Sequence, residues 1–409
     1  MLIVQKYGGT SVGSVERIER VADRVARTVA QGNKVAVVVS AMGHTTDELV
    51  SLAHQIEAVP SAREYDALLA TGEQVSAALV AMALNKRGVR AQSFTGWQAG
   101  IRTEPVHGSA RIAHIDTNFL ENALSSGTVP IITGFQGIAD GSITTLGRGG
   151  SDTSAVAVAA ALSADLCEIY TDVKGVYTTD PRVVGSAKKL NEVSYDEMLE
   201  LANLGAQVLH PRAVESAKQH HVRLVVRSSF HEEEGTMVVE RPAEFENRDV
   251  VTGIAFEREV ARIAIIGMPR HQNGLATVFS TLANRGVNVD VIVQSVVHSD
   301  EVDVSFTVHE VETEKTLGIL RELHAGLKYR DVVNETGLAK VSIVGAGMIS
   351  NPGVAASMFR CLAEAGVSVH MVSTSEIKVS CIISANLVEP AVKALHATFI
   401  EADIPAVTK

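Results

Sequence analysis

The sequence is poor in cysteine, in aromatic residues and in long apolar runs. It holds three cysteines, and aromatic residues make up 4% of the chain. Cys167, Cys361 and Cys381 lie far apart without CxxC spacing, each in an apolar stretch, which excludes the usual zinc and redox motifs and favours free buried thiols. With so few aromatic rings, the cores must be built from aliphatic residues, which is typical of α/β proteins with buried parallel strands.

Two further absences bear on location and partners. We find no run of about 18 apolar residues and no charged leader before the strand-like MLIVQKY, so we expect a cytoplasmic protein with no membrane partner. Positive charge is also scarce, because 36 Lys and Arg face 47 Asp and Glu, for a formal net charge of -11. Without a basic stripe we expect no nucleic-acid partner, whereas a small anionic ligand remains compatible with a few local cations.

The first part of the chain alternates β-branched runs with segments of helical period. Its 409 residues exceed one ordinary domain. The pattern predicts strands over Leu2–Lys6, Val35–Ser40, Val129–Thr133, Leu166–Tyr170 and Leu224–Ser228, and helices over Val15–Gln31, Glu73–Arg87 and Ser151–Leu162. Alternating strands and helices predict a three-layer α/β sandwich with a mostly parallel sheet, for which we expect residues 1–245.

A charged segment containing Pro242 interrupts this pattern between Phe230 and Asp249 and indicates a domain boundary, a surface hairpin being the alternative. Beyond it the chain repeats itself: Gly267 and Gly345 are 78 residues apart, and a second pair of glycines, before Val287 and Val367, is 80 residues apart. Each copy predicts a βαββαβ ferredoxin-like unit. We expect these units over residues 246–335 and 336–409, with a C-terminal strand that either stays in the second unit or returns to the first.

Three segments carry glycines, hydroxyls and charge where strands end. The first, KYGGTSVGS from Lys6 to Ser14, predicts a phosphate cradle, since glycines let backbone N–H groups approach an anion and the lysine adds a charge. It is not the GxxxxGK[ST] loop, and a glycine turn beside a surface lysine is the alternative. The second, GRGGSD from Gly147 to Asp152, leads into an Ala-rich helix. A helix cap alone would account for neither the arginine nor the two glycines before Ser151, whereas an anion bound at the start of the helix would account for all of them.

The third segment, YTDVKGVYTTDPR from Tyr170 to Arg182, follows a predicted buried strand. It is a turn sequence, yet its place at a strand's carboxyl end and its mixture of aromatic, hydroxyl and cationic groups suit a nucleotide.

These motifs, together with SAM at Ser40–Met42, TGE at Thr71–Glu73 and LHPRAVE, resemble the aspartate kinases of the amino-acid kinase family. The repeats resemble paired ACT domains, and the resemblance covers nearly the whole chain. It implies transfer of the γ-phosphoryl group of ATP, bound with Mg²⁺, to the side-chain carboxylate of L-aspartate. This reaction leads towards lysine, threonine and methionine.

The resemblance also implies roles for individual residues. Lys6 and Asp152 are the expected catalytic pair, in which the lysine contacts the transferring phosphoryl group and the aspartate orients the lysine. The residues expected to bind ATP are Lys6, Tyr7, Gly8, Gly9, Thr10, Thr171, Asp172, Tyr177 and Arg182. Those expected to bind aspartate are Ser40, Thr45, Glu73, Arg148, Gly149, Gly150 and Ser151. Arg148 is expected to bind a carboxylate of the substrate, and Glu73 is expected to bind its ammonium group.

For the repeats, the resemblance implies feedback by lysine or threonine and assembly of copies of the chain through the ACT units. It leaves open whether a separate regulatory subunit exists. The expected effector contacts are Asn288, Val289, Asp290, Gln294, Val354, Ser368, Val369, Thr374, Ser375 and Glu376. Two departures from the family pattern stand out: Gln207 replaces a frequent lysine, and the first repeat reads PRHQNG where relatives often carry an aspartate.

No metal site is expected, because the adjacent His220 and His221 point apart on a helix and His210 has no acidic partner at ligand spacing. Two rival functions stay open at this point. One is a kinase of glutamate or acetylglutamate, and the other is an amino-acid sensor with an inactive kinase half. The presence of Lys6, Glu73, Arg148 and Asp152 together argues against the second.

Overall fold

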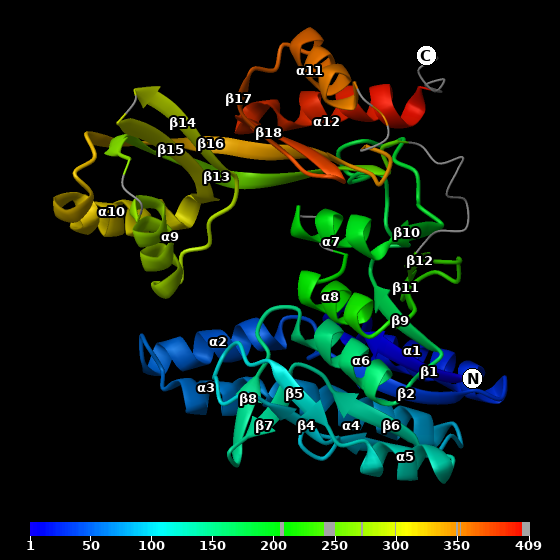
Figure 1. Ribbon diagram of the computed structural model, residues 1–409. Coiled ribbons are helices and arrows are strands. Elements are labelled where there is room, and N and C mark those ends of the chain that lie inside the picture. Colours follow the sequence, from blue (N-terminus) through cyan, green and yellow to red (C-terminus); the bar gives the residue numbers. More distant parts are fainter. Residues whose placement is uncertain are drawn as a thin grey trace. The chain divides into compact units, whose positions relative to one another are not determined.

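A computed structural model of the chain describes residues 1–204, 208–240, 250–270, 273–298, 300–348, 351 and 353–402 (Figure 1). The chain divides into two compact units. Unit 1 comprises Met1–Tyr177, Lys189–Asn203 and Gln207–Glu246, and unit 2 comprises Thr178–Lys188, Leu204–Ala206 and Asn247–Lys409. The chain therefore passes from unit 1 into unit 2 and back twice before it enters unit 2 for the last time at Asn247.

The main sheet of unit 1 has eight strands in the order β10-β12-β11-β9-β1-β2-β6-β3. Its strands are β1 (Leu2–Tyr7), β2 (Lys34–Val39), β3 (Ala91–Phe94), β6 (Val129–Thr133), β9 (Leu166–Thr171), β10 (Glu192–Ser194), β11 (Leu224–Ser228) and β12 (Thr236–Val239). All neighbours are parallel except β11 and β12. The predicted mostly parallel sheet is confirmed.

A second, four-stranded sheet in unit 1 has the order β5-β4-β7-β8. Its strands are β4 (Ile101–Thr103), β5 (Ile112–Ile115), β7 (Gln136–Ala139) and β8 (Ser142–Thr145). Strands β7 and β8 form a hairpin in which Gln136 pairs with Thr145 at its base. This second sheet was not predicted from the sequence.

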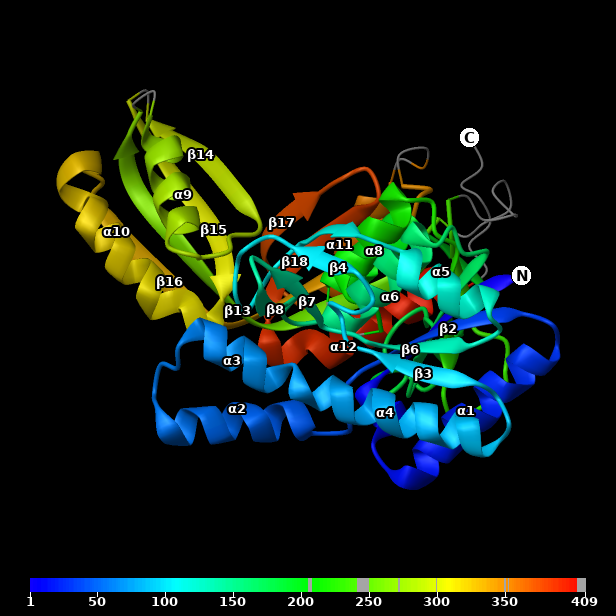
Figure 2. The same cartoon turned by 90° about the horizontal axis from the view of Figure 1, so that it is seen from below.

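Helices cover both faces of the main sheet, as Figures 1 and 2 show. The helices of unit 1 are α1 (Val15–Ala30), α2 (Thr45–Ile56), α3 (Ala62–Leu69), α4 (Thr71–Lys86), α5 (Asn118–Ser125), α6 (Gly150–Ala161), α7 (Tyr195–Asn203) and α8 (Pro211–Gln219). Alternate residues of β1 point to opposite faces. Tyr7 joins a core cluster with α1 and α4, whereas Lys6 faces the other side, where α6 contacts β1.

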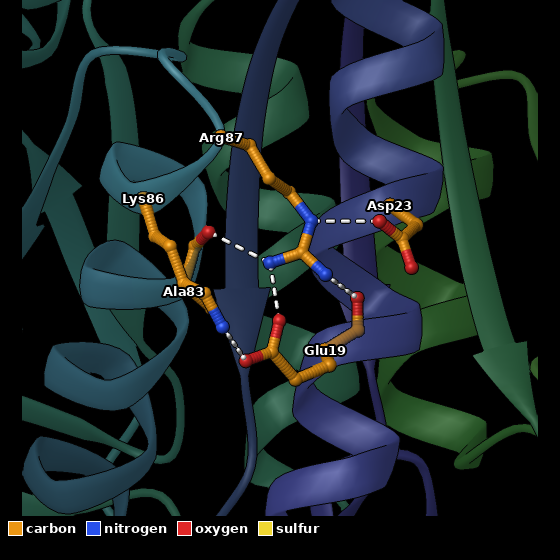
Figure 3. Close-up of polar contacts among 5 residues, drawn as sticks. All are labelled: Glu19, Asp23, Ala83, Lys86 and Arg87. Atoms are coloured by element: carbon orange, nitrogen blue, oxygen red, sulfur yellow. Dashed lines mark hydrogen bonds and ion pairs between the residues drawn. The ribbon is translucent and has the colours of Figure 1, made fainter.

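Helices α1 and α4 also meet through charged groups outside this cluster (Figure 3). Arg87, just after α4, donates from Nε to Asp23 at 2.7 Å and from Nη2 to the carbonyl oxygen of Glu19 at 3.1 Å. The carboxylate of Glu19 pairs with both Arg87 and Lys86. Lys86 first, and then Arg87, lower the pKa of Glu19, so the contact between the two helices strengthens above acidic pH.

Helices α3 and α4 form one helical stretch, Ala62–Lys86, that is long and apolar enough by composition to cross a membrane, the one such stretch in the described residues. No such stretch was predicted from the sequence. Over half of its most apolar window, 56%, is buried inside the protein. Because Ala77, Val80 and Leu84 of α4 pack in the core with α1, we interpret it as a core helix.

Unit 2 contains one six-stranded sheet in the order β14-β15-β13-β16-β18-β17. Its strands are β13 (Gly253–Pro269), β14 (Ile292–His298), β15 (Glu301–His309), β16 (Asp331–Val344), β17 (Val369–Thr374) and β18 (Lys378–Ser384), and its helices are α9 (Gly274–Asn284), α10 (Thr313–Leu327), α11 (Val354–Glu364) and α12 (Val388–His396). Figure 1 shows α9 and α10 over the first repeat and α11 and α12 over the second. The two predicted repeats are confirmed.

The repeats share their long strands. The carboxyl-terminal part of β13 pairs with β15, and its amino-terminal part pairs with the end of β16 from Gly253↔Val344 to Glu257↔Lys340. The second repeat therefore takes a strand from before the first, a division that differs from the expected simple boundary at residue 336. Any C-terminal strand lies outside the described residues, as do residues 241–249 in the expected boundary segment.

The loop segment Thr178–Lys188 packs within unit 2. Val184 lies in the hydrophobic core of the second repeat, and the backbone N–H of Ile254 donates to the carbonyl oxygen of Thr178 at 2.7 Å. The Thr178 hydroxyl lies 3.0 Å from Nε2 of His396, which is fully buried at the end of α12. This segment was expected to belong wholly to the first domain, and the structure groups it with the repeats instead.

Candidate active site

Lys6 and Asp152 meet at the carboxyl edge of the main sheet. Lys6 lies in β1 between Val38 of β2 and Ile169 of β9, and Asp152 lies in the first turn of α6. The ammonium Nζ of Lys6 is 2.6 Å from Oδ1 of Asp152, and the two side chains are 10% and 13% exposed. A paired but nearly buried ammonium group at this edge offers a positive charge to an anion without free movement of the lysine chain.

Close backbone contacts hold the first glycine loop against the loop after β2. The N–H of Gly43 donates to the carbonyl oxygen of Gly9 at 3.0 Å, and a Cβ added to Gly9 would lie 2.9 Å from the carbonyl oxygen of Ala41. A short 3₁₀ turn, Gly9–Val12, follows, and α1 begins later, at Val15 after its cap Ser14. The helix therefore starts where the sequence pattern predicted, and the glycine loop before it forms this turn, with Thr10 exposed on it.

Tyr7 was expected among the ATP contacts, but its side chain lies in the core. It is fully buried and stacks on Tyr170 of β9, with ring centroids 4.7 Å apart. The N–H of Gly8 donates to the carbonyl oxygen of Tyr170 at 3.2 Å. The stacked rings therefore hold together the two strands from which the first and third predicted loops emerge, and only the main chain of Tyr7 faces the loop.

Glu73 is a buried carboxylate with one unpaired oxygen. It lies in the first turn of α4 and is 3% exposed. Its Oε1 accepts a hydrogen bond from the N–H of Ala41 at 3.1 Å, while Oε2 has no hydrogen-bond partner in the described structure. Burial raises the pKa of this carboxyl to about 7. A buried oxygen without a donor indicates a missing cationic or hydrogen-bonding ligand.

Ser40 and Thr45 flank this carboxylate. The carbonyl oxygen of Ser40 accepts from Ser76 of α4 at 2.7 Å, and the Thr45 methyl group lies 3.6 Å from the Cβ position of Gly72. Both predicted substrate residues are therefore near the amino end of α4. Their hydroxyls remain partly exposed there.

The GRGGSD loop places its arginine in solvent beside the start of α6. Arg148 is exposed and forms no hydrogen bond or ion pair with the described residues. Gly149 caps α6 with φ 70°, and Gly150 is the first residue of the helix. Ser151 is 9% exposed and lies against Gly134, where an added Cβ would be 2.7 Å from its hydroxyl. The exposed guanidinium is thus available to a ligand.

The third predicted loop is divided between the two units. Thr171 ends β9, and its hydroxyl donates to Asp172 at 3.1 Å. Tyr177 is half-buried at the end of this part of unit 1 and bridges to Lys189. Arg182 belongs to unit 2, is 85% exposed and pairs with Asp180 at 2.7 Å. Arg182 is therefore the one predicted nucleotide contact that lies outside unit 1.

Comparison with known proteins gives the family. Residues 1–228 match the profile of the amino acid kinase family, and residues 263–323 and 341–399 match that of the ACT domain. Aspartokinases from Geobacillus stearothermophilus and Pseudomonas aeruginosa are 57% and 49% identical to the chain, over 97% and 99% of its length and 97% and 98% of theirs. The chain belongs to the aspartokinase family.

Solved aspartokinase structures agree in fold. Aspartokinase III of Escherichia coli, solved in complex with aspartate and ADP, is 30% identical with a TM-score of 0.84, and the match covers 97% of this chain and 99% of that one. The same enzyme in complex with lysine and aspartate gives a TM-score of 0.75, over 98% and 99% of the two chains. The resemblance inferred from the sequence motifs is thereby confirmed.

The effector residues expected in the ACT repeats are largely exposed. The structure places Asn288, Val289, Asp290 and Gln294 before and on edge strand β14, Val354 at the start of α11, and Ser368, Val369, Thr374, Ser375 and Glu376 before, on and after edge strand β17. Asp290 pairs with Lys340 of β16, which also lies 2.7 Å from Glu257. Val289 and Val354 are half-buried.

One residue of the active site was not predicted. His210 caps α8, and its imidazole packs on Gly149, where an added Cβ would lie 2.1 Å from Cγ. Burial lowers the pKa of this imidazole, with Asp152 opposing the change and Arg148 adding to it. The sequence signal was its place in LHPRAVE, next to a proline at a helix start. Gln207, in the same segment, lies outside the described residues.

Among the residues that the structure describes, no three or more His, Cys, Asp or Glu side chains are arranged to hold a metal ion. His221 is exposed and lies 3.2 Å from Glu240. The three cysteines are free and buried, as predicted.

Proposed function

We propose that this protein transfers the γ-phosphoryl group of ATP to the side-chain carboxylate of L-aspartate, giving 4-phospho-L-aspartate and ADP. The observation that carries the proposal is the ion pair between Lys6 and Asp152, at 2.6 Å, between two glycine-rich loops. Phosphoryl transfer requires positioning and charge stabilisation more than covalent help. A fixed ammonium group at the edge of the sheet supplies both.

In this reaction a carboxylate oxygen of aspartate forms a bond to the γ-phosphorus while the bond to the bridging oxygen of ADP breaks, and the electron pair leaves with ADP. A free aspartate side chain has a pKa near ~3.9, so the nucleophile is already ionised at neutral pH and no general base is required. Lys6 stabilises the charge on the transferring group, and the N–H group of Gly9 faces the same anion, whereas that of Gly8 is bonded to Tyr170. Asp152 holds Lys6 in place.

Aspartate is held at both ends of its backbone. Arg148 binds the α-carboxylate through its planar guanidinium, and Glu73 binds the α-ammonium group with the oxygen that has no protein partner. Ser40, Thr45 and Ser151 add hydrogen bonds, beside the backbone of Gly149 and Gly150. E. coli aspartokinase III has been solved with aspartate and ADP, which supports this choice of substrates over glutamate.

The nucleotide lies along the loops after β1 and β9. Thr10, Thr171, Asp172 and Tyr177 contact it, and Arg182 stays a predicted contact. ATP enters as its Mg²⁺ complex, and the ion bridges phosphate oxygens as part of the substrate. Asp172 and the ribose hydroxyls are natural hydrogen-bond partners.

The ACT repeats bind an amino-acid effector, lysine or threonine, and associate between copies of the chain in the cytoplasm. The E. coli enzyme has been solved with lysine, which supports lysine as one effector. The PRHQNG loop of the first repeat, of which His271 and Gln272 lie outside the described residues, favours an effector site in the second repeat. A separate regulatory subunit would contain these same repeats, and the proposal does not require one.

The test is ADP release by the purified full chain with L-aspartate, L-glutamate and N-acetyl-L-glutamate, each with MgATP, compared with Lys6→Ala. We expect turnover with aspartate alone and its loss in Lys6→Ala. Turnover with either glutamate compound would favour the rival kinase, and no turnover in the wild type would favour the inactive sensor. Addition of lysine and threonine, singly and together, tests feedback in the same assay.

A further inference from the structure

Asp66 is a fully buried carboxylate that the proposed reaction does not use. It lies in α3 with 0% exposure. Its oxygens accept hydrogen bonds from Nδ1 of His107 at 2.8 Å, from the N–H of Gly108 at 3.1 Å, and from both the N–H and the hydroxyl of Thr145, at 3.0 and 2.6 Å. Such a set of donors satisfies both carboxylate oxygens.

The donors come from two segments far from Asp66 in sequence. Thr145 ends β8 and is three residues before Arg148, while α3 continues into α4, which carries Glu73 in its first turn. One carboxylate therefore joins the helix that holds the predicted ammonium contact to the strand that leads into the predicted carboxylate contact. All of these residues lie in unit 1.

The opposite strand of the same hairpin is attached to the same helices. Gln136 pairs with Thr145 at the base of the β7–β8 hairpin, and its Nε2 donates to the carbonyl oxygen of Ala70 at 2.8 Å, at the junction of α3 and α4. Both strands at the base of the hairpin are thus fixed to the α3–α4 helix. A one-residue change in register would break both contacts.

A third contact fixes the residues between Thr145 and Arg148. Arg212 of α8 donates from Nη1 to the carbonyl oxygen of Leu146 at 2.6 Å and from Nη2 to that of Ala110 at 2.9 Å. The segment before the GRGG loop is therefore held from two directions. Its arginine remains exposed, although the backbone that carries it is fixed on both sides.

A buried carboxylate is a costly way to join a hairpin to a helix if stability is the sole requirement, because apolar packing does so without desolvating a charge. Its advantage is directional: each donor has to lie along a fixed line, so the network defines position more sharply than apolar contacts do. Precise placement matters at a substrate site, where an error of about 1 Å can cost a factor of about 10² in rate.

We propose that Asp66 is a positioning residue for aspartate recognition, which sets the separation between Glu73 and Arg148 and so selects an L-amino acid with both α-groups free. The proposal rests on the proposed function, in which these two residues hold the α-ammonium and α-carboxylate groups. Asp66 itself does not touch the substrate. Its effect is on the binding of aspartate and on the discrimination between its enantiomers.

The test is steady-state kinetics of Asp66→Asn with L- and D-aspartate and with ATP. The amide presents an N–H group to donors and keeps a single acceptor oxygen, so the network cannot form in full. We expect KM for L-aspartate to rise about tenfold or more, which corresponds to about 1.4 kcal/mol, with KM for ATP within about twofold of the wild type. The preference in kcat/KM for L- over D-aspartate should fall.

Two controls separate positioning from general stability. Glu197→Gln removes another buried carboxylate of unit 1, which accepts from the N–H and hydroxyl of Ser194 at 3.0 and 2.7 Å. It should lower the melting temperature without changing the ratio of the two KM values. Thr145→Val removes one hydrogen bond to Asp66, and Thr145→Ser keeps it, so the valine variant alone should raise KM for L-aspartate.

An equal rise of both KM values in Asp66→Asn, or an unchanged KM for L-aspartate and an unchanged enantiomer preference, would overturn the proposal. If Asp66→Asn does not fold, Thr145→Val and Thr145→Ser decide, and identical kinetics of these two would overturn it as well. Failure of the proposed function is distinct, because the wild type itself would then show no aspartate-dependent turnover.

Discussion

Gly149 lies directly against the imidazole ring of His210, so that a Cβ at position 149 would be 2.1 Å from Cγ of the histidine. Gly149 has φ 70° and caps the helix that carries Asp152. The contact joins the GRGGSD loop to the LHPRAVE motif, two segments that the sequence places about sixty residues apart. It fixes the backbone next to Arg148, in the loop between β8 and α6.

Gly149→Ala should therefore lower both stability and activity. The substitution adds a left-handed backbone strain of about 1–2 kcal/mol and a steric clash that displaces His210 or the start of α6. Gly32→Ala is the matched control, because Gly32 has φ 85° with nothing within 4 Å of its Cβ position. Urea unfolding should show a larger loss for Gly149→Ala, and ADP release should fall in that variant alone. Equal losses in both would contradict the importance of the contact.

Asp152→Asn tests the orienting role of the aspartate. The amide keeps the size of the side chain and loses the charge that holds Lys6 at 2.6 Å. By analogy with other electrostatic groups at reaction centres, we expect kcat to fall about 10²–10³-fold, with a smaller effect on KM for aspartate. Stopped-flow or coupled measurement of ADP release gives both values. A kcat close to that of the wild type would contradict the role.

The raised pKa of Glu73, about 7, predicts a pH dependence of aspartate binding. The ionised carboxylate binds an ammonium group, so KM for aspartate should rise as the pH falls from 8 to 6. Glu73→Gln should bind aspartate weakly at every pH and lose this dependence. A wild-type KM that is flat over this range would contradict the assignment of Glu73 to the ammonium group.

Without substrate, the raised pKa of Glu73 makes the folded protein less stable at high pH, although the same pKa makes aspartate binding stronger there. A carboxyl whose folded pKa is raised contributes its full stability below the unfolded pKa, and this stability is lost as the pH rises through about 7. Glu73→Gln should therefore become more stable than the wild type above pH 7, by on the order of 3 kcal/mol. Thermal unfolding at pH 5 and pH 8 measures the difference. No gain at pH 8 would show that the carboxylate is not desolvated as described.

Lys340 allows a test of the contribution of a buried charge cluster to the stability of unit 2. It is 8% exposed in its side chain and pairs with Glu257 and Asp290, whose coulombic attraction and hydrogen bonds raise the pKa of the lysine against the effect of burial. Lys340→Met leaves two carboxylates without their cation and should destabilise unit 2 by about 1–3 kcal/mol, a range that allows for partial exposure of the two acids. Lys393→Met, at an exposed pair with Glu389, should have little effect. Similar losses would contradict the prediction.

Much of this architecture is predictable from local sequence. The β-branched runs give the five predicted strands of the main sheet to within two residues, because buried parallel strands have no polar face to confuse the pattern. The repeat near 80 residues gives the two ACT units. The glycine motifs likewise mark Lys6, Arg148 and Asp152, which the structure brings to one edge of the sheet.

What escaped prediction depends on contacts between distant segments. Nothing local shows that Tyr7 turns into the core, that His210 covers Gly149, or that Thr178–Lys188 joins the ACT unit, since each requires the fold to be known. Asp66 looks like an ordinary helical surface residue in REYDALL, and its burial follows from the hairpin that docks on it. The sharing of β13 between the repeats has no sequence signal either, because one long strand serves both.

Phosphorylation of the side-chain carboxylate of aspartate is tested most directly by identification of the phosphorylated product. Incubation of the full chain with L-aspartate, MgATP and hydroxylamine converts an acyl phosphate into a hydroxamate, whose position mass spectrometry and chromatography against standards can assign. We expect the β-hydroxamate of aspartate with the wild type and no hydroxamate with Lys6→Ala. The α-hydroxamate, no hydroxamate, or equal formation by Lys6→Ala would contradict it.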